Sequence, residues 1–178
     1  MKKLREEPLL HTTVFTVVRK EFEDVNFSPV GLNCNDWVMV IVVDKNFKTL
    51  VVKQTRWGLE GKTIEFPCGT VEANEPPVTA AIRELMEETG IEKVDTTALR
   101  EIACFNPNPA YFNNKMHIYR YDIDKMPEKF GEQKLDEHED CEPYVVNLGP
   151  SLYKELSKHA MGLAAIGAIT MSGLVEVR

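Results

Sequence analysis

The chain has 178 residues, of which 43% are hydrophobic, and its 28 acidic side chains exceed its 21 basic ones, giving a net charge of −7. This hydrophobic content is typical of a globular protein and excludes a disordered chain. The length suits one domain with its own core. The acidic balance argues against partners such as nucleic acid or a membrane surface, which favour a basic protein. It does not exclude a phosphorylated substrate, because divalent cations can bridge two negative partners.

The cysteines and the apolar stretches predict the compartment. The four cysteines, at 34, 68, 104 and 141, form no CxxC pair, so we expect reduced thiols rather than a zinc ribbon or a redox motif. The N-terminal stretch MKKLREEPLL has no apolar core of a secretory signal. The longest apolar stretch, 161–171, is far shorter than the roughly 20 residues that cross a bilayer. We therefore expect a soluble cytoplasmic protein.

The first half of the chain predicts strands. Residues 12–22 are β-branched and aromatic, which is typical of a strand. Residues 37–43 form a continuous apolar run, as in a buried strand. The turn DKNF follows, and residues 49–57 return as a further strand, so the two runs predict a hairpin.

A helix is predicted over 76–89, because its apolar residues recur every three or four positions. Pro76 and Pro77 suit the first turn of this helix, and Gly90 suits its C-terminal cap. Further strands are expected at 98–105, 115–123 and 142–148, with two short helices at 151–159 and 161–171. Strands around one strongly patterned helix and a terminal helix pair predict an α+β or layered α/β/α domain.

Three glutamates of the 76–89 helix, Glu84, Glu87 and Glu88, stand at positions i, i+3 and i+4 and share one face. Like charges at these spacings destabilise a helix by about 0.2–0.5 kcal/mol per pair, and they repel more strongly in a partly dry cleft. A divalent cation reverses this effect, and carboxylate oxygens with water are the ligands that Mg²⁺ or Mn²⁺ prefers. By itself the triplet indicates either a solvated acidic face or a metal site.

The residues around the triplet follow the pattern Gly69-x5-Glu75-x7-Arg83-Glu84-Leu85-x-Glu87-Glu88-x-Gly90-Ile91. Over these 23 residues the chain matches every defined position of the Nudix box, and so it resembles the Nudix hydrolase superfamily. The resemblance implies an α/β/α sandwich with a mixed β-sheet. It also implies Mg²⁺- or Mn²⁺-dependent hydrolysis of a nucleoside diphosphate linked to another group. We expect an N-terminal β extension over 1–36, followed by the Nudix domain over 37–178.

The resemblance also implies residue roles within the box. The main metal ligands would be Glu84 and Glu88, with Glu87 assisting and the backbone carbonyl of Cys68 as a further ligand. Arg83 belongs to the same catalytic set. Together with Glu75, it would hold the loop against the helix through an ion pair, while Gly69 lets the backbone turn.

Outside the box, the chain resembles the ADP-ribose and nucleoside-diphosphate-sugar pyrophosphatases over about residues 12–170. Residues 51–56 resemble their strand ending in Gln-x-Arg, residues 64–69 their Glu-hydrophobic-Pro-Ala-Gly lead-in, and residues 136–142 their acidic loop. In such a loop one glutamate removes a proton from the attacking water and another binds metal. By position, Glu137 would be the general base and Glu139 the ligand.

We expect Arg56, Glu65 and Trp37 to bind the substrate. The guanidinium of Arg56 suits the oxygens of a pyrophosphate or ribose, and Glu65 belongs to the lead-in. Trp37 could stack on a base, as could Trp57, Phe15 and Phe22. After the box, Asn113 and Asn114 stand where well-marked ADP-ribose pyrophosphatases carry an acidic pair, which leaves another sugar nucleotide open as substrate.

The expected function is hydrolysis of the pyrophosphate bond of ADP-ribose or another nucleoside diphosphate sugar. One alternative is 5′-pyrophosphate removal from RNA or nucleoside triphosphates, and the acidic chain disfavours the RNA form of this reaction. The other is a non-catalytic nucleotide-sugar-sensing module, although all glutamates of the box are present. In the resembling enzymes the strands before the core sheet cross to a partner subunit, which implies a homodimer through the N-terminal strands.

Overall fold

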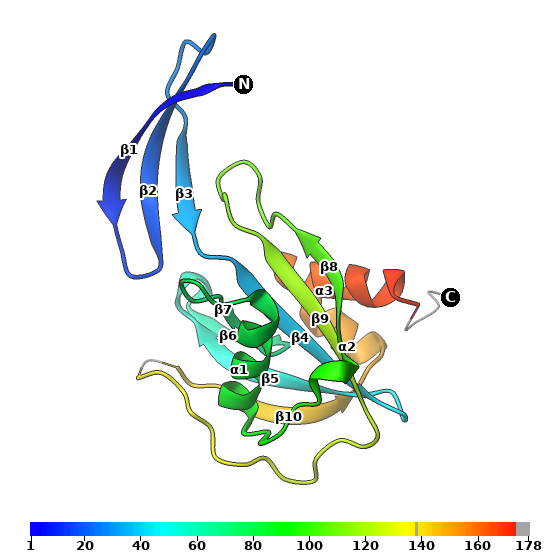
Figure 1. Ribbon diagram of the computed structural model, residues 1–178. Helices are drawn as coiled ribbons and strands as arrows, with labels where there is room; N and C mark the ends of the chain where they lie inside the picture. The colour runs from blue at the N-terminus through cyan, green and yellow to red at the C-terminus, as the bar shows by residue number, and fades with distance from the viewer. Residues whose placement is uncertain (138, 174–178) are drawn as a thin grey trace.

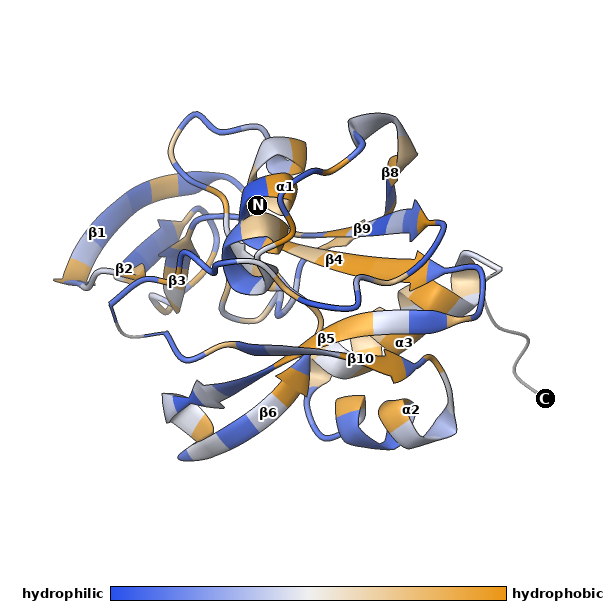
Figure 2. Cartoon of the chain, turned by 90° about the horizontal axis from the view of Figure 1, so that it is seen from below, coloured by the Kyte–Doolittle hydropathy of each residue, from blue (hydrophilic) through white to orange (hydrophobic). Residues whose placement is uncertain are grey.

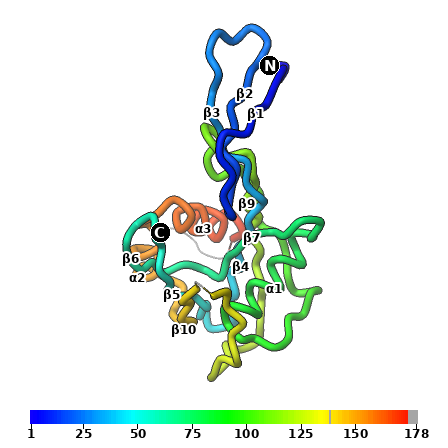
Figure 3. Tube along the Cα trace, turned by 90° about the vertical axis from the view of Figure 1, so that its left-hand side faces the viewer, coloured from blue at the N-terminus to red at the C-terminus, as the bar shows by residue number. Residues whose placement is uncertain are grey.

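A computed structural model describes residues 1–137 and 139–173 and divides their strands between two sheets (Figure 1). The first sheet is antiparallel and consists of β1 (Lys3–His11), β2 (Phe15–Phe22) and β3 (Val30–Cys34). This sheet projects away from the rest of the chain (Figure 3). β2 lies within the strand expected over 12–22. β1 and β3 lie within the β extension expected over 1–36 but were not predicted as individual strands, because their mixed sequences lack a clear alternation.

The second sheet has the strand order β10-β5-β4-β9-β8, with β6 paired to β5 and β7 paired to β4. β4 and β9 are parallel, and the other paired strands are antiparallel, which confirms the predicted mixed sheet. The strands are β4 (Trp37–Asp44), β5 (Lys48–Arg56), β6 (Gly61–Glu65), β7 (Cys68–Thr70), β8 (Leu99–Phe105), β9 (Met116–Ile123) and β10 (Glu142–Asn147).

The predicted hairpin of β4 and β5 closes at its turn and then opens. The strands pair at Val43 and Thr49, next to the turn. Beyond this point β4 continues between β7 and β9, whereas β5 continues between β6 and β10. The short β6–β7 segment therefore fills the fork between the diverging strands, and the backbone N–H of Val40 donates to the carbonyl of Pro67 there (2.8 Å).

Helices cover both faces of the second sheet. Helix α1 (Pro77–Thr89) packs on one face, while α2 (Pro150–Leu156) and α3 (Ala160–Met171) pack on the other. Side chains of β4 alternate between the two cores: Val38, Val40 and Val42 face α1, and Met39, Ile41 and Val43 face α2 and α3. Figure 2 shows the apolar strands β4 and β5 between the helices. This is the predicted α/β/α sandwich.

Two short 3₁₀ helices, at Trp57–Leu59 and Thr96–Ala98, complete the elements. All four cysteines are free thiols. Among the residues that the structure describes, no helix is long and apolar enough to cross a membrane.

Candidate active site

A cavity of about 540 Å³ lies at the fork between β4 and β5. Residues of α1, of the strands around the fork, of the 124–141 connection and of the start of α3 line it. Its charged lining residues include Arg56, Glu65, Arg83, Glu84, Glu87, Lys134, Asp136 and Glu139. Its apolar lining residues include Val14, Trp37, Leu59, Met116 and Met161.

The Arg83 guanidinium organises the acidic wall of this cavity. Its Nε and Nη2 bind the two oxygens of Glu75 (3.1 and 3.0 Å), so the ion pair expected from the sequence is present. Its Nη1 donates to Glu84 (2.9 Å) and Glu87 (3.0 Å), and Nη2 also donates to the Thr70 carbonyl (2.8 Å). The hydrogen bonds from Arg83 to Glu75 lower the pKa of the Glu75 carboxyl below its usual value. Arg83 therefore fixes the loop before the helix and orients Glu84 and Glu87, two of the predicted metal ligands.

Gly69 allows Glu84 to reach the backbone of β7. The Glu84 carboxylate accepts a hydrogen bond from the N–H of Thr70 (3.1 Å). A Cβ atom at position 69 would collide with that carboxylate, so any larger residue here would force Glu84 out of this position. Burial raises the pKa of the Glu84 carboxyl, although Arg83 counteracts the shift.

Glu88 is the most buried carboxyl of the box, with 2% of the residue exposed. Its two oxygens accept from the backbone N–H of Cys68 (2.9 Å) and from the thiol of Cys141 (3.3 Å). Burial raises the pKa of Glu88 to about 8, and the nearby Glu84 and Glu139 carboxylates act in the same direction. Without a cation, this carboxyl therefore prefers its neutral form at neutral pH.

The donor set fits a hard divalent cation. Carboxyl oxygens of Glu84, Glu87 and Glu88 are ligands that Mg²⁺ and Mn²⁺ accept, and the repulsion that raises the pKa of Glu88 would be relieved by a positive ion. Arg83 holds Glu84 and Glu87, while Glu88 faces Cys68 and Cys141. These carboxylates have different partners and do not all point to one position. Mg²⁺ keeps several of its waters when bound, so it does not need every carboxylate as a direct ligand.

The acidic loop reaches the cavity through some of its residues. Glu139 lines the cavity, and its carboxylate accepts from the N–H of Asp136 (3.2 Å). Asp140 anchors the loop by accepting from the N–H (2.7 Å) and hydroxyl (2.7 Å) of Thr55 and from Lys62 (2.8 Å). Glu137 is exposed and is not among the residues that line the cavity. Its role as general base stays a prediction.

The rest of the 124–141 connection packs against the C-terminal half of α1. The N–H of Lys134 donates to the Glu87 carbonyl (3.0 Å), and the side-chain amide of Gln133 donates to the Cys141 carbonyl (2.9 Å). This docking places Lys134 in the lining of the cavity. The sequence did not single out Lys134, since one lysine in a long polar loop carries no positional signal.

Arg56 and Glu65 form one unit in the cavity wall. Nε and Nη2 of Arg56 bind the two carboxylate oxygens of Glu65 at 2.8 and 2.7 Å. Hydrogen bonding to Glu65 raises the pKa of Arg56, so the cation is permanent. Within the described residues, the remaining nitrogen, Nη1, donates to no protein group. The predicted substrate residue Glu65 therefore holds Arg56, and the free edge of Arg56 is available to an anion.

Of the candidate aromatic residues, Trp37 lines the cavity and Phe112 packs edge-on against it, with ring centroids 5.7 Å apart. The other three, Trp57, Phe15 and Phe22, are not among the lining residues. Gln54 belongs to the Gln-x-Arg motif but was not predicted as a site residue. It is 5% exposed, lines the cavity and has an Nε2 without a partner among the described residues. Its place two residues before Arg56 on β5 was the available signal, because alternate residues of a strand share a face.

Comparisons with known proteins agree with this geometry. The chain matches the NUDIX domain family over residues 36–149. It is 31% identical to the ADP-ribose pyrophosphatase of Bacillus subtilis (strain 168), covering 85% of this chain and 84% of that protein. It is also 31% identical to the methanol dehydrogenase activator of Bacillus methanolicus, covering 67% and 68%. A crystal structure of an ADP compounds hydrolase shares the fold, with a TM-score of 0.66 at 20% identity over 98% of both chains.

The chain therefore belongs to the Nudix family, and it is a Nudix hydrolase. Within the family it is an ADP-ribose pyrophosphatase-like member, in line with the branch predicted from residues outside the box.

Proposed function

We propose that the protein hydrolyses the pyrophosphate bond of a nucleoside diphosphate sugar, with ADP-ribose as the first candidate, in a reaction that requires Mg²⁺ or Mn²⁺. The observation that carries this proposal is the cavity itself. It combines the Nudix-box carboxylates of Glu84 and Glu87 with the cations Arg56 and Lys134 and with apolar side chains that include Trp37. A diphosphate with an organic group at each end needs these three kinds of contact.

The roles of the residues follow from their surroundings. Glu84, Glu87 and Glu88, together with Glu139 and the Cys68 carbonyl, would hold the divalent cation. When bound, this cation supplies positive charge to the phosphate oxygens as the bond to phosphorus breaks.

Other side chains would position the substrate. The free Nη1 edge of Arg56 and the ammonium of Lys134 would bind the diphosphate oxygens. The Nε2 of Gln54 would donate a hydrogen bond to an oxygen in the cavity, which would satisfy a buried donor that the protein leaves unpaired. Trp37 would contact the base.

A carboxylate of the acidic loop would accept the proton of the attacking water. Glu137 has this role by position in the resemblance, and its exposed place on the loop requires the loop to move once substrate is bound. Glu139 already lines the cavity and would act as a metal ligand.

A panel of diphosphates tests the proposal. ADP-ribose, GDP-mannose, UDP-glucose, NADH, a nucleoside triphosphate and capped RNA are incubated with Mg²⁺, with Mn²⁺ and with EDTA, and the products are separated chromatographically. We expect a nucleoside monophosphate and a sugar phosphate from at least one sugar nucleotide, and no turnover in EDTA. Absence of turnover of every diphosphate in both metals would overturn the proposal.

The substitution Glu88→Gln tests the metal assignment. We expect kcat/KM to fall by roughly 100-fold or more, because a lost metal ligand removes several kcal/mol of transition-state stabilisation. The metal-free fold should persist, since a buried neutral carboxyl and an amide differ little in charge or size. Glu92→Gln, on an exposed residue beyond α1, is the matched control and should keep full activity. Near-normal rates in Glu88→Gln would make the assignment wrong.

The relative named as a methanol dehydrogenase activator suggests a second candidate function, in which the chain activates a dehydrogenase. The two candidates are separable, because an activator that works without hydrolysis should keep its effect in Glu88→Gln. A dehydrogenase assay with wild-type protein and this variant makes the distinction.

We also propose that the protein is a homodimer and that residues 1–36 form the extension through which it assembles. The first sheet projects from the core, and it carries exposed apolar side chains at Leu4, Leu10, Val14 and Phe27. Val14, in the β1–β2 turn, lines the chain's own cavity. The extension would therefore contribute both to assembly and to the substrate site.

A further inference from the structure

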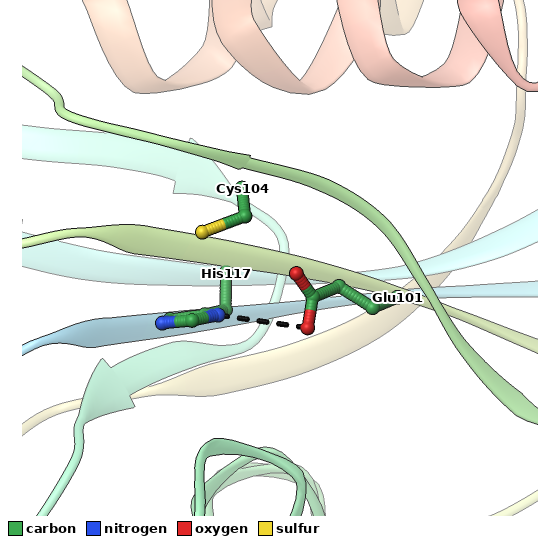
Figure 4. Close-up of side chains that lie close together, drawn as sticks. All are labelled: Glu101, Cys104 and His117. Carbon is green, nitrogen blue, oxygen red and sulfur yellow. Dashed lines mark ion pairs between the residues drawn. The ribbon is translucent and has the colours of Figure 1, made fainter.

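A second group of chemically capable side chains lies on the strands β8 and β9, away from the cavity. One oxygen of Glu101, the sulfur of Cys104 and one ring nitrogen of His117 all lie within 4.8 Å of one another. Figure 4 shows the three side chains gathered at one place on the paired strands. None of them lines the cavity of the Nudix box.

An irregularity in β8 creates this cluster. Cys104 is directly opposite His117 in the β8–β9 pairing, so these two side chains share a face. Residues 101 and 104 would point to opposite faces of a regular strand, because side chains alternate. The register shifts between Glu101 and Ala103, and such a bulge resets the alternation. Glu101 therefore joins the other two on one face.

His117 is held between two carboxylates. Its Nδ1 lies 3.6 Å from an oxygen of Glu101, and its Nε2 lies 3.5 Å from an oxygen of Asp36. The side chain is only 12% exposed. Both ring nitrogens are buried, and neither forms a hydrogen bond of good geometry with another described residue. A buried imidazole with two unsatisfied nitrogens is costly unless a ligand completes the site.

Asp36 is fixed in place by its own contacts. Its other carboxylate oxygen accepts from the N–H of Lys115 (2.7 Å), and its backbone carbonyl accepts from the N–H of Val71 (2.8 Å). An Asp at the far nitrogen of a histidine is the usual partner that orients an imidazole toward a metal. If Asp36 accepts from Nε2–H, then Nδ1 carries its lone pair on the side of Glu101.

We propose that Glu101, Cys104 and His117 form a second metal site, which binds Zn²⁺ with Asp36 as the residue that orients His117. The ligand types are those that Zn²⁺ prefers over Mg²⁺: imidazole nitrogen, thiolate sulfur and carboxylate oxygen. Nitrogen and oxygen ligands of one tetrahedral Zn²⁺ are about 3.4 Å apart, close to the 3.6 Å between Nδ1 and Glu101. Glu101 and Cys104 are exposed, so water takes the fourth position.

The site would act on the junction between the two sheets. Asp36 lies in the short connection between β3 and β4, where the chain passes from the projecting sheet into the core. A bound ion would link β8 to β9 and, through His117 and Asp36, to this connection. Its effect would be on stability and on the placement of the first sheet, rather than on the chemistry in the cavity.

Cobalt spectroscopy of the full-length protein tests the proposal. Co²⁺ replaces Zn²⁺ in tetrahedral sites, and a Co²⁺–thiolate bond gives a charge-transfer absorption that carboxylate ligands do not give. With excess Mg²⁺ present to occupy the Nudix carboxylates, we expect this absorption at one Co²⁺ per chain, and we expect added Zn²⁺ to abolish it.

Two cysteine variants assign the sulfur. Cys104→Ser should remove the thiolate absorption, and Cys34→Ser, on a free thiol of β3, should keep it. Cys68 and Cys141 lie beside the Nudix carboxylates. An absorption that persists in Cys104→Ser would therefore place the ion at the cavity and overturn the proposal, as would the absence of any thiolate absorption in the wild type.

Asp36→Asn tests the orienting role. Asparagine can still accept from Lys115, but it no longer offers a carboxylate to His117. We expect Zn²⁺ affinity to fall by roughly 10–100-fold, as for other partners of metal-bound histidines. Unchanged affinity would show that Asp36 does not orient the ring.

Calorimetry of Zn²⁺ binding gives an independent readout. Zn²⁺ binds a cysteine as its thiolate, so a thiol that becomes a ligand has to release its proton to the buffer on binding. Titrations in buffers of different ionisation enthalpy should show about one proton released, and His117→Gln should lose this binding. Equal Zn²⁺ binding by His117→Gln and wild type would contradict the site.

Discussion

At the scale of single residues, charge balance explains why the Nudix helix needs a cation. Arg83 is shared by three carboxylates, Glu75, Glu84 and Glu87. Glu88 has no cationic partner among the described residues, and its pKa rises to about 8 as a result of burial. The surplus of negative charge is thus concentrated where a divalent ion would offset it. The net charge of −7 argued against nucleic acid as a partner. It is compatible with a phosphate-bearing substrate at these carboxylates, where a divalent ion would offset the charge.

The two loop glutamates give a prediction that separates the base from a ligand. Glu137→Gln should lower kcat by roughly 100-fold or more, because general-base catalysis contributes about 10²–10⁴-fold, and should leave metal affinity unchanged. Glu139→Gln should weaken Mn²⁺ binding, since Glu139 lines the cavity near Glu84 and Glu88. The measurements are steady-state kinetics across a Mn²⁺ titration and direct Mn²⁺ binding.

Glu132→Gln, on an exposed residue of the same connection, is the control for this pair. If Glu137→Gln keeps the wild-type kcat while Glu139→Gln loses it at saturating metal, the two roles are exchanged. That result would agree with the position of Glu139, which lines the cavity in the structure.

The residues of the box were predictable because their spacing is local. Positions i, i+3 and i+4 of one helix are neighbours whatever the tertiary structure. Gln54 and Lys134 were not predicted as site residues, because they reach the cavity through the divergence of β5 and the docking of a long connection. Glu65, which was predicted as a substrate residue, lines the cavity, and its two oxygens bind Arg56.

At the scale of elements, the turn between β4 and β5 depends on Asp44. This residue is 5% exposed, and its carboxylate accepts from the N–H groups of Asn46 (2.8 Å), Lys48 (3.0 Å) and Met126 (3.3 Å). Burial by itself would raise the pKa of Asp44, but these backbone donors outweigh it and lower the pKa below the usual 3.8. The side chain therefore joins the turn to the start of the 124–141 connection.

Asp44→Asn should destabilise the fold by roughly 1.5–3 kcal/mol at neutral pH, because it weakens hydrogen bonds to a charged acceptor. The new side-chain NH₂ group would also face the N–H of Met126, so that this hydrogen bond is lost. Since the pKa of Asp44 is lowered in the folded state, its contribution is present above pH 3.8 and is lost as pH falls through the lower folded value. Denaturant unfolding at several pH values should show the difference between wild type and variant shrinking in acid.

Asp124→Asn provides the control for this experiment. Asp124 pairs with Lys45 on the surface (2.6 Å), and its side chain is 88% exposed, so its loss should leave the free energy of unfolding nearly unchanged. A gap between wild type and Asp44→Asn that widens in acid would contradict the sign of the argument.

Elements with strong local patterns were predicted well, and their pairing was not. Helix α1 and strands β4, β5, β8, β9 and β10 lie within a residue or two of their expected bounds. The hairpin was correct at its turn, but no local pattern indicated that β4 and β5 would separate. The separation depends on β7 and β9 pairing with β4, and these strands are distant along the chain.

At the scale of the whole molecule, the projecting first sheet has far fewer buried residues than the second sheet. β1 has no fully buried residue, and of the eight residues of β2 only Val18 is buried. A three-stranded sheet with so little buried surface gains little stability by itself. The β8–β9 loop supports β3 through hydrogen bonds. The N–H of Leu32 donates to the Tyr111 carbonyl (2.7 Å), the N–H of Cys34 donates to the side-chain oxygen of Asn113 (2.9 Å), and the N–H of Asn113 donates to the Leu32 carbonyl (3.3 Å). A second copy of the chain would cover the remaining apolar side chains.

Leu10→Asp tests this assembly. Leu10 lies on β1 and is 56% exposed in the single chain. Burying a leucine contributes about 1.5–3 kcal/mol, and a two-fold interface contains each substitution twice. We therefore expect the dimer dissociation constant to rise well over tenfold, measured by sedimentation velocity over a range of concentrations. Leu163→Asp is the matched control, because Leu163 on α3 is 55% exposed and lies outside the first sheet. A wild-type protein that stays monomeric, or a Leu163→Asp variant that dissociates while Leu10→Asp does not, would place assembly elsewhere.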